Sequence, residues 1–321
     1  MPTCCWRQSR ASPVLVLVLL LLLSPTFRAT WTPAHMTPAI TDRTFSFTGS
    51  YISSALSLQV GSNQADASYI YRSTDEGFTW DVLPAASTTA TLLDVTAIHT
   101  TISGTTHTNV VAVGANVGNG GIIMCSSNSG TSFISVEVAN LLIGVKMVLE
   151  SADTMSAFAV GVNGAAYTAT SADFAIWTQL DFTDSTGATI DATGSKFYSV
   201  SLFHSGPLNA IIVGDYGLVL SRKASASSYW TVNTLGGGTS AMITVAHSPQ
   251  YANVAIVAGE GGHIYITYNH GSSWTSMTAG DASVFTYSSI TYDTFKYHVV
   301  SMVRKILQSV PLFLRSHHHI N

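Results

Sequence analysis

Charge is what this 321-residue sequence has least of: only 9% of its residues are charged, against roughly 25% in an average soluble domain. The formal net charge is -4, and the few Lys and Arg residues do not cluster. Nucleic-acid binding needs a basic stripe or patch, so we exclude it. With 46% hydrophobic residues the chain is not expected to be disordered, because disordered segments combine low hydrophobicity with high charge.

Cysteine is also scarce, with three in the chain. Cys4 and Cys5 lie in an N-terminal targeting segment and are expected to leave with it. Cys125 then remains alone, so an intrachain disulfide is excluded from the mature chain. A lone buried Cys acts either as a small hydrophobe, which we favour, or as a reactive thiol. Burial of a large core must therefore stabilise the fold.

The N-terminus has the pattern of a secretory signal. Arg7 and Arg10 precede a ten-residue apolar run at 14–23 (VLVLVLLLLL), which is shorter than the roughly 20 residues that span a bilayer. We predict a signal peptide at 1–29, with an uncleaved signal anchor as the alternative. It would direct the chain to the secretory pathway, and it is the only contact with a membrane that we expect. Residues 30–44 carry Pro33 and Pro38 and are predicted to form an extended linker or edge segment.

From residue 45 onward the pattern is β throughout, and it repeats. Apolar strands that end in a Gly recur at 56–61, 110–114, 157–161, 210–214 and 254–259. A Gly-rich hairpin and a further strand follow each one. Closing aromatics recur at separations of 53, 44, 53 and 44 residues, namely Trp80, Phe133, Trp177, Trp230 and Trp274. This period lies at the upper end of what one four-stranded propeller blade needs. A solenoid of stacked hairpins is the rival arrangement.

The turn before three of these aromatics has one design. Its polar residue can accept backbone N–H bonds, its Gly supplies a positive φ, and its ring anchors the next strand. The residues concerned are Ser73, Asp75, Gly77 and Trp80; Ser126, Asn128, Gly130 and Phe133; and Thr267, Asn269, Gly271 and Trp274. The third and fourth units are two residues longer and lack the Gly, so we predict looser turns there.

The S/T-x-D/N-x-G-x-x-W/F turn resembles the Asp-box of bacterial-neuraminidase-repeat β-propellers. Together with the preceding V-G-x-x-G hairpin, seen at Val213 to Gly217, it is most similar to the photosystem II stability/assembly factor family. The resemblance covers about residues 45–280. It implies an all-β propeller of four-stranded blades and a scaffold role on a membrane-protein intermediate in a photosynthetic lumen. Asp-boxes also occur in sialidases, xyloglucanases and sortilin-type receptors, so the resemblance is stronger for fold than for function.

The repeat weakens towards the C-terminus. Segments 284–292 and 297–303 are predicted as the first two strands of an incomplete sixth unit. We therefore place the propeller at 45–295 and predict a partly helical or disordered tail at 296–321. The triplet of His317, His318 and His319 is a metal tract or, as we prefer, part of that tail. No cluster has metal-ligand spacing elsewhere, and we expect no metal and no cofactor.

The candidate functional residues lie in the hairpins that connect the second strand of a unit to its third strand. Asp215 and Glu260 occupy matching hairpin positions and could form the carboxylate pair of a glycosidase, although acidic residues are also common in tight turns. Asn163 and Tyr216 are polar companions on the same face. Arg72 and Arg222 lie at the opposite end of their strands, so the Arg cluster that a sialidase needs is not assembled.

From the residues we expect a binding protein rather than an enzyme. The first hypothesis is a non-catalytic secreted or lumenal propeller that binds a protein partner of unknown identity. The alternative is a carbohydrate-active propeller, a glycoside hydrolase or a glycan-binding protein, that uses Asp215, Glu260 and Tyr216. A plastid or thylakoid-lumen location follows if the source is photosynthetic.

Overall fold

The described strands belong to one unit, residues 34–321, in a computed structural model of the protein. The structure describes 35–37, 45–53, 56–62, 68–75, 78–83, 90–102, 105–118, 120–151, 154–170, 174–204, 208–222, 229–277, 285–292, 297–303 and 315–320. The predicted signal peptide at 1–29 lies outside these residues.

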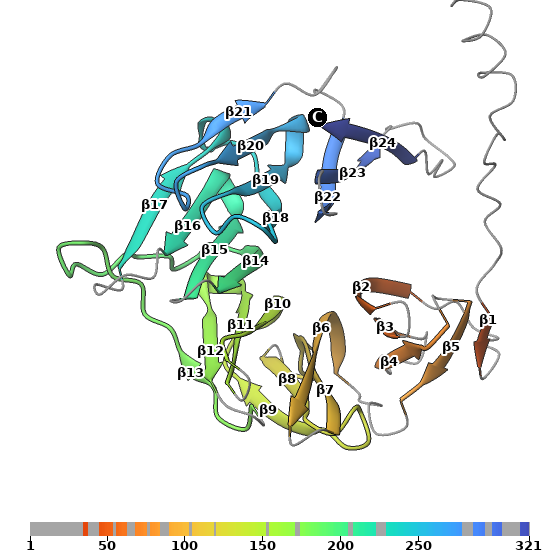
Figure 1. Ribbon diagram of the computed structural model, residues 1–321. Coiled ribbons are helices and arrows are strands. Elements are labelled where there is room, and N and C mark those ends of the chain that lie inside the picture. The colour runs from red at the N-terminus through yellow and green to blue at the C-terminus, as the bar shows by residue number, and fades with distance from the viewer. Residues whose placement is uncertain are drawn as a thin grey trace, which may run out of the picture. The chain divides into compact units, whose positions relative to one another are not determined.

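The described strands form six sheets, each built mainly from strands that follow one another in the chain (Figure 1). The first has the order β1-β5-β4-β3-β2 and consists of β1 (His35–Thr37), β2 (Phe45–Ser53), β3 (Leu56–Ser62), β4 (Ser68–Ser73) and β5 (Thr79–Val82). The second consists of β6 (Thr91–Ile102), β7 (Thr105–Ala115), β8 (Gly121–Ser126) and β9 (Ile134–Val138). The third consists of β10 (Leu142–Leu149), β11 (Met155–Gly161), β12 (Ala166–Thr170) and β13 (Thr178–Gln179).

The remaining sheets repeat the plan. The fourth consists of β14 (Phe197–His204), β15 (Leu208–Gly214), β16 (Leu218–Arg222) and β17 (Trp230–Thr234). The fifth consists of β18 (Met242–His247), β19 (Ala255–Gly259), β20 (Ile264–Thr267) and β21 (Thr275–Met277). The sixth has three strands, β22 (Phe285–Tyr292), β23 (Tyr297–Val303) and β24 (Arg315–Ile320). Apart from β1 and β5, which run parallel, the paired strands are antiparallel.

Apolar composition and position in the sheet go together. Every residue of β11 and of β8 is buried, whereas the outer strands β9 and β21 are largely exposed. Hydrophobic clusters join each sheet to the next, from the first sheet through to the fifth. Inner strands covered on both faces read as continuous apolar runs, which is why AFAVG and AIIVG could be recognised in the sequence.

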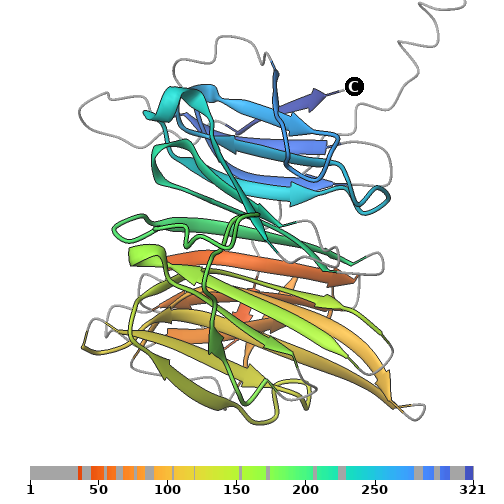
Figure 2. The same cartoon turned by 90° about the vertical axis from the view of Figure 1, so that its left-hand side faces the viewer.

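The predicted fold class is confirmed: the structure is all-β, and five of its sheets contain the antiparallel four-stranded unit of a propeller blade. Successive first strands, from β2 and β6 through β10, β14 and β18 to β22, lie in contact along one side of the sheets. The closing aromatics Phe133, Trp177 and Trp274 pack against the inter-sheet clusters, and Trp230 is itself part of one. Figure 2 shows the strands along their length, with the connecting turns at the two ends of the sheets.

Both terminal segments contribute strands to a sheet. Within 30–44, the segment predicted to be an extended linker or an edge segment, β1 pairs with β5 as an edge strand. The predicted strands at 284–292 and 297–303 are present as β22 and β23. In the predicted helical or disordered tail, residues 315–320 instead pair with β23 as β24, and this strand includes the His triplet; residues 304–314 lie outside the described part.

A glycine ends the second strand for a steric reason that repeats from sheet to sheet. A Cβ on Gly161 would stand 1.9 Å from the carbonyl oxygen of Leu141, and one on Gly259 would stand 2.1 Å from that of Ala241. The same carbonyls accept the next backbone N–H, from Val162 and Glu260. The close approach of two backbones, rather than an unusual φ, therefore requires the Gly.

Candidate functional site

The hairpin between the second and third strands has the same geometry in three consecutive sheets. It forms the short 3-10 turns η2 (Val162–Gly164), η3 (Asp215–Gly217) and η5 (Glu260–Gly262). The central residue of each is left-handed, with φ of 57° at Asn163, 55° at Tyr216 and 65° at Gly261. The first N–H of each turn donates to a carbonyl at the start of the sheet's first strand, so backbone groups close the turn.

Tyr216 stands out among these central residues. It is 69% exposed, and a bulky residue in the left-handed region costs of order 1 kcal/mol or more. Gly serves at the same position of η5 without that cost. The strained backbone holds a large ring at the tip of the hairpin, where packing does not explain it.

Asp215 is held by the strand beneath it. The hydroxyl of Tyr198 donates to Oδ1 of Asp215 at 2.6 Å. Burial raises the pKa of Tyr198 far above its usual range, and the bond and charge of Asp215 raise it further, with smaller contributions from Glu260 and Tyr216. Tyr216 follows Asp215 in η3, and Glu260 begins the matching turn η5 of the next sheet. We call Tyr198, Asp215, Tyr216 and Glu260 the hairpin cluster.

Glu260 has its own structural bond: its Oε2 accepts the backbone N–H of Ala241 at 3.1 Å. Asp215 and Glu260 thus each accept a hydrogen bond from an internal donor with one carboxylate oxygen. The second oxygen of each is left for other contacts. Next to Glu260, the rings of His263 and Tyr265 stack with centroids 6.0 Å apart. The hydroxyl of Tyr265 accepts the N–H of Gly236, which ties the Gly-rich turn η4 (Gly236–Gly238) to this side of the cluster.

The sequence prediction named three members of the cluster and missed Tyr198. Phe197 pairs with Gly214 and Ser199 with Val213, so Tyr198 is the extra residue of a β-bulge. Bulges re-aim side chains and often lie beside functional sites. The corresponding bulge residues in the second, third and fifth sheets are apolar, namely Leu93, Ile143 and Ile243. The polar Tyr198 at a position where these units carry an apolar residue is the feature of the sequence that could have indicated its role.

Asn163, the fourth predicted binding residue, is exposed on η2 of the third sheet. Its Nδ2 donates to Oδ1 of Asn140 at 3.2 Å, a residue of the loop that precedes β10. Among the described residues, no interaction joins it to the hairpin cluster. The prediction that it contributes to one binding face stays a prediction.

The opposite end of the blades carries the turns at 126–133 and 267–274, which share one hydrogen-bond pattern. Oδ1 of Asn128 accepts the hydroxyl of Ser126 and the N–H of Ser132. The hydroxyl oxygen of Ser126 in turn accepts the N–H of Gly130. Thr267 and Asn269 make the same bonds to Gly271 and Ser273. We call these two turns, together with the related turn that begins at Ser73, the box turns.

In the first box turn, Asp75 takes the place of the Asn. It accepts hydrogen bonds from the hydroxyl of Ser73 and from both the N–H and the hydroxyl of Thr79. Those bonds, above all the one from the Thr79 hydroxyl, lower the pKa of Asp75 below its usual value. Trp80 lies in β5 and is half-buried, and Gly77 lies outside the described residues. Both oxygens of the carboxylate therefore accept hydrogen bonds from the turn itself.

The longer turns of the third and fourth units are described only in part, because 171–173 and 223–228 lie outside the described residues. Trp177 is half-buried, and its Nε1 donates to the carbonyl oxygen of Phe174 at 2.9 Å. Trp230 is fully buried and forms an edge-on contact with Phe182. The predicted looseness of these two turns remains untested.

The described part of the chain holds neither an assembled metal site nor a membrane-crossing helix. There, no group of three or more His, Cys, Asp and Glu side chains is placed to hold a metal ion. None of the helices in those same residues has the length and apolar character needed to cross a membrane.

Comparisons with known proteins identify the fold. No family model and no curated protein matches the chain. Among solved structures, YCF48 from Cyanidioschyzon merolae is similar over 82% of this chain and 94% of its own, with a TM-score of 0.50 and 13% identity. Sqt1 from Saccharomyces cerevisiae is similar over 81% and 71%, with a TM-score of 0.50 and 12% identity. Likenesses at such identities establish the β-propeller architecture and say nothing of activity or partner.

Proposed function

We propose that this chain is a non-catalytic β-propeller that binds a protein partner through the end that carries the hairpin cluster. The observation that carries the proposal is Tyr216, a 69% exposed aromatic held in a left-handed turn next to Asp215. Rigid exposed Tyr residues supply large contact area at low entropic cost and are enriched at binding hot spots. The negative charges of Asp215 beside it and of Glu260 at the matching position of η5 would favour a partner segment that carries Lys or Arg.

Catalysis is the weaker interpretation of the same residues. A glycosidase needs one acidic group that protonates the leaving oxygen and one that acts as base or nucleophile. Here Asp215 is bonded to Tyr198, and Glu260 is bonded to the backbone of Ala241. Both bonds fix the carboxylates as hydrogen-bond acceptors on the scaffold. We infer that their second oxygens recognise a ligand rather than transfer protons.

Glycan binding is the second candidate, and one observation favours it. The exposed ring of Tyr216 next to the carboxylate of Asp215 offers a flat apolar face beside an acceptor for sugar hydroxyls. A glycan array and a hydrolysis screen separate the candidates: protein binding alone predicts a blank array, a lectin predicts binding without turnover, and a hydrolase predicts both. Asp215→Asn and Glu260→Gln should abolish any sugar response.

Where the chain acts is part of the proposal. A signal peptide at 1–29 would place it in the secretory pathway or, in a photosynthetic source, in a plastid or thylakoid lumen. There it would act as an assembly scaffold of the kind that the resemblance to photosystem II assembly factors implies. N-terminal sequencing of the mature protein should begin near residue 30, and an intact Met1 would contradict this location.

The partner proposal is tested by quantitative co-purification from the source compartment. Three immobilised full-length baits are compared: wild type, a Tyr216→Ser variant, and a matched Tyr268→Ser control. Tyr268 is 62% exposed and lies in a box turn at the other end. We expect one protein to be lost with Tyr216→Ser and kept with the control. Equal recovery on all three baits would contradict the proposed surface.

A further inference from the structure

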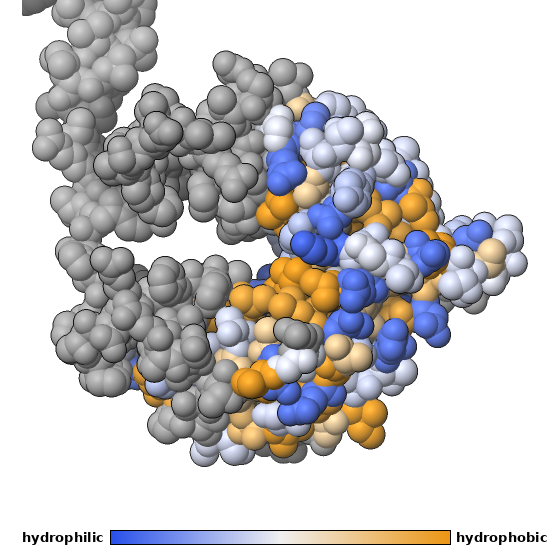
Figure 3. Space-filling model, turned by 180° about the vertical axis from the view of Figure 1, so that it is seen from behind, coloured by the Kyte–Doolittle hydropathy of each residue, from blue (hydrophilic) through white to orange (hydrophobic). Residues whose placement is uncertain are grey.

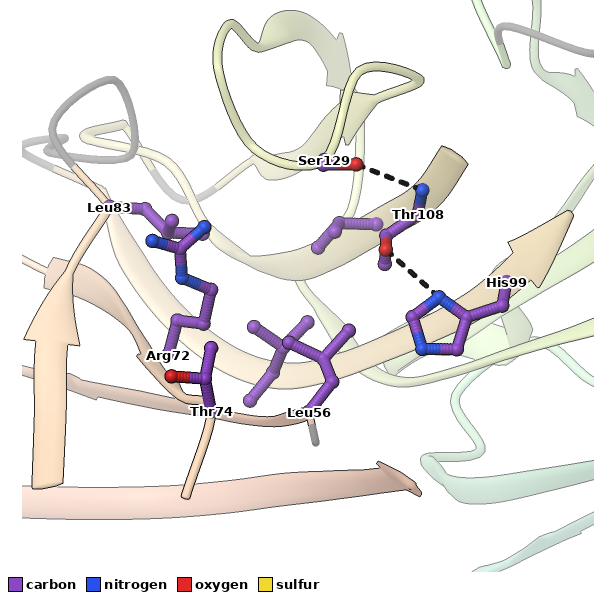
Figure 4. A pocket seen from close by; sticks show the side chains of 9 residues that line it. Leu56, Arg72, Thr74, Leu83, His99, Thr108 and Ser129 are labelled. Carbon is purple, nitrogen blue, oxygen red and sulfur yellow. Dashed lines mark hydrogen bonds between the residues drawn. The ribbon is translucent and has the colours of Figure 1, made fainter. Parts of the chain in front are cut away.

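A pocket of about 170 Å³ lies between the first and second sheets, at the end of the box turns and away from the hairpin cluster (Figure 4). Its walls are apolar at the bottom and polar at the rim. Leu56, Leu58, Leu83 and Val110 form the apolar part, all of them at least 92% buried. The polar part consists of Arg72, Thr74, His99, Thr108 and Ser129.

Most of the polar rim is already fixed by its own bonds. Thr108 donates its N–H to Oγ of Ser129 at 3.0 Å, and its hydroxyl bonds Nδ1 of His99 at 3.0 Å. Both bonds are drawn in Figure 4. These three side chains therefore form a rigid wall, with Ser129 supplied by a box turn of the second sheet and Thr108 by β7.

Arg72 differs from that wall. It comes from β4 of the first sheet, and its guanidinium extends beside Leu83 at the pocket (Figure 4). Asp81 is its register partner on β5, yet among the described residues no ion pair or hydrogen bond of the Arg72 guanidinium is found. A guanidinium carries five donors in a planar fork that matches a carboxylate. A cation at the mouth of an apolar pocket is complementary to an anion with an apolar body.

We propose that this pocket binds a monocarboxylate with a compact apolar body, with the body on the leucine floor and the carboxylate on Arg72. The volume sets the size: a cavity of about 150 Å³ lined by apolar side chains is known to hold benzene, so a phenyl or branched alkyl group fits. Two sources supply such chemistry, a free aryl or aliphatic acid and the C-terminal residue of a peptide. The site is independent of the hairpin cluster and of the function proposed for it.

The test is a binding titration on the full chain with benzoate, phenylacetate and 3-phenylpropionate, each against its uncharged amide. The methyl resonances of Leu56 and Leu83 report where the ligand sits. We expect saturable binding of at least one acid, no binding of its amide, and shifts at both Leu residues. Binding of acid and amide alike, or of neither, would overturn the proposal.

Two variants make the role of Arg72 specific. Arg72→Gln should weaken acid binding at least ~10-fold, because charge-assisted bidentate bonds are the strong ones. Lys146→Gln removes the same charge from an exposed site on β10 and should leave binding unchanged. Equal loss in both variants would show a general charge effect and overturn the site. Arg72→Lys, which keeps the charge without the fork, should fall between them.

A third comparison identifies the source. A short peptide ending in Phe is tested with a free and with an amidated C-terminus. Tighter binding of the free-ended peptide than of the best small acid assigns the pocket to peptide ends. The opposite order assigns it to a free acid. Failure of both peptides and all acids rejects the pocket as a carboxylate site, while the co-purification experiment remains a separate test of the hairpin cluster.

Discussion

The two ends of the blades close their turns in different ways. At the box end, side chains close the turn: Asn128 and Asn269 bond the backbone and hydroxyls of their own loops. At the hairpin end, backbone bonds and glycines close it, as Val162, Asp215 and Glu260 each donate an N–H to a neighbouring carbonyl. Side chains needed for closure cannot vary freely, whereas side chains at the hairpin tips can.

This difference in turn closure indicates which end of the blades can carry variable recognition residues. The three hairpins carry Asn, Tyr and Gly at their left-handed position, Asn163, Tyr216 and Gly261, although their backbones match. The box turns keep a Ser or Thr followed by an Asp or Asn. A repeat scaffold can therefore change its recognition residues at the hairpin end without rebuilding the turn.

The largest expected effect comes from replacing the glycine that ends a second strand at the hairpin end. In Gly161→Ala the new Cβ would stand 1.9 Å from the carbonyl oxygen of Leu141 and 2.8 Å from Cα of Leu142, so backbone must move. We expect the free energy of unfolding to fall by about 3 kcal/mol or more. In Gly187→Ala the new Cβ meets nothing within 4 Å, and only the positive φ of 83° opposes it; the cost should stay near 1 kcal/mol. Denaturant unfolding measures both, and equal costs would contradict the steric account.

The next effect concerns a buried imidazole at the box end of β18. Burial lowers the pKa of His247 to about 4, with a smaller contribution from His270. As pH falls below the unfolded value of about 6.5, the unfolded chain binds the proton first. Stability should therefore decline between about pH 6.5 and pH 4, by about 3 kcal/mol in total.

His247→Phe isolates that contribution, because the variant has no proton to bind at this site. Urea unfolding at a series of pH values should give a flatter slope in the variant than in wild type. His247 Nδ1 bonds Oγ of Ser201, so the variant starts from a lower stability at pH 7. Parallel slopes for the two proteins would rule out His247 as the source of the pH dependence.

A smaller effect tests side-chain closure of the box turns. Asn269→Ala removes the acceptor of the Thr267 hydroxyl and of the Ser273 N–H, and we expect a loss of about 1 kcal/mol. Asn269→Asp keeps that acceptor and copies Asp75, which accepts bonds from the N–H and hydroxyl of Thr79. Thermal unfolding should rank wild type close to Asn269→Asp and above Asn269→Ala. An Ala variant as stable as wild type would mean that the side chain does not hold the turn.

The smallest effect has the opposite sign. Tyr216→Gly removes left-handed strain at a φ of 55°, and the gain is offset by the greater entropy of Gly in the unfolded chain. Stability should stay the same or rise by up to about 1 kcal/mol, while recovery of the proposed partner is lost. A clear loss of stability would show that the ring packs on the blade and is not held out for binding.

The sequence predicted the features that depend on local chemistry. The glycines that end the second strands, the box turns and the apolar second strands recur because each unit needs the same residues for the same backbone geometry. The all-β propeller class could be predicted from this recurrence. Asp215, Tyr216 and Glu260 could be placed on one face for the same reason. The strand at 315–320 was not foreseen, because its residues, including three His, lack a strand pattern.

The features that were missed depend on pairing and packing. Tyr198 enters the hairpin cluster because a β-bulge inserts it between Phe197 and Ser199, and a bulge is a property of two strands in register. The pocket at Arg72 depends on how the first two sheets pack. From the sequence, Arg72 could only be placed at the end away from the hairpins, where no ligand was expected.

A photo-crosslinking amino acid placed at 216 or at 268 tests the central claim most directly. Both Tyr residues are highly exposed but belong to opposite ends of the blades, so each position reports on one end under equal labelling. Crosslinking in the source compartment should give a discrete protein adduct from position 216 that disappears in an Asp215→Asn, Glu260→Gln background, and none from position 268. The same adduct from position 268, or its persistence in that background, would contradict a partner surface at the hairpin end.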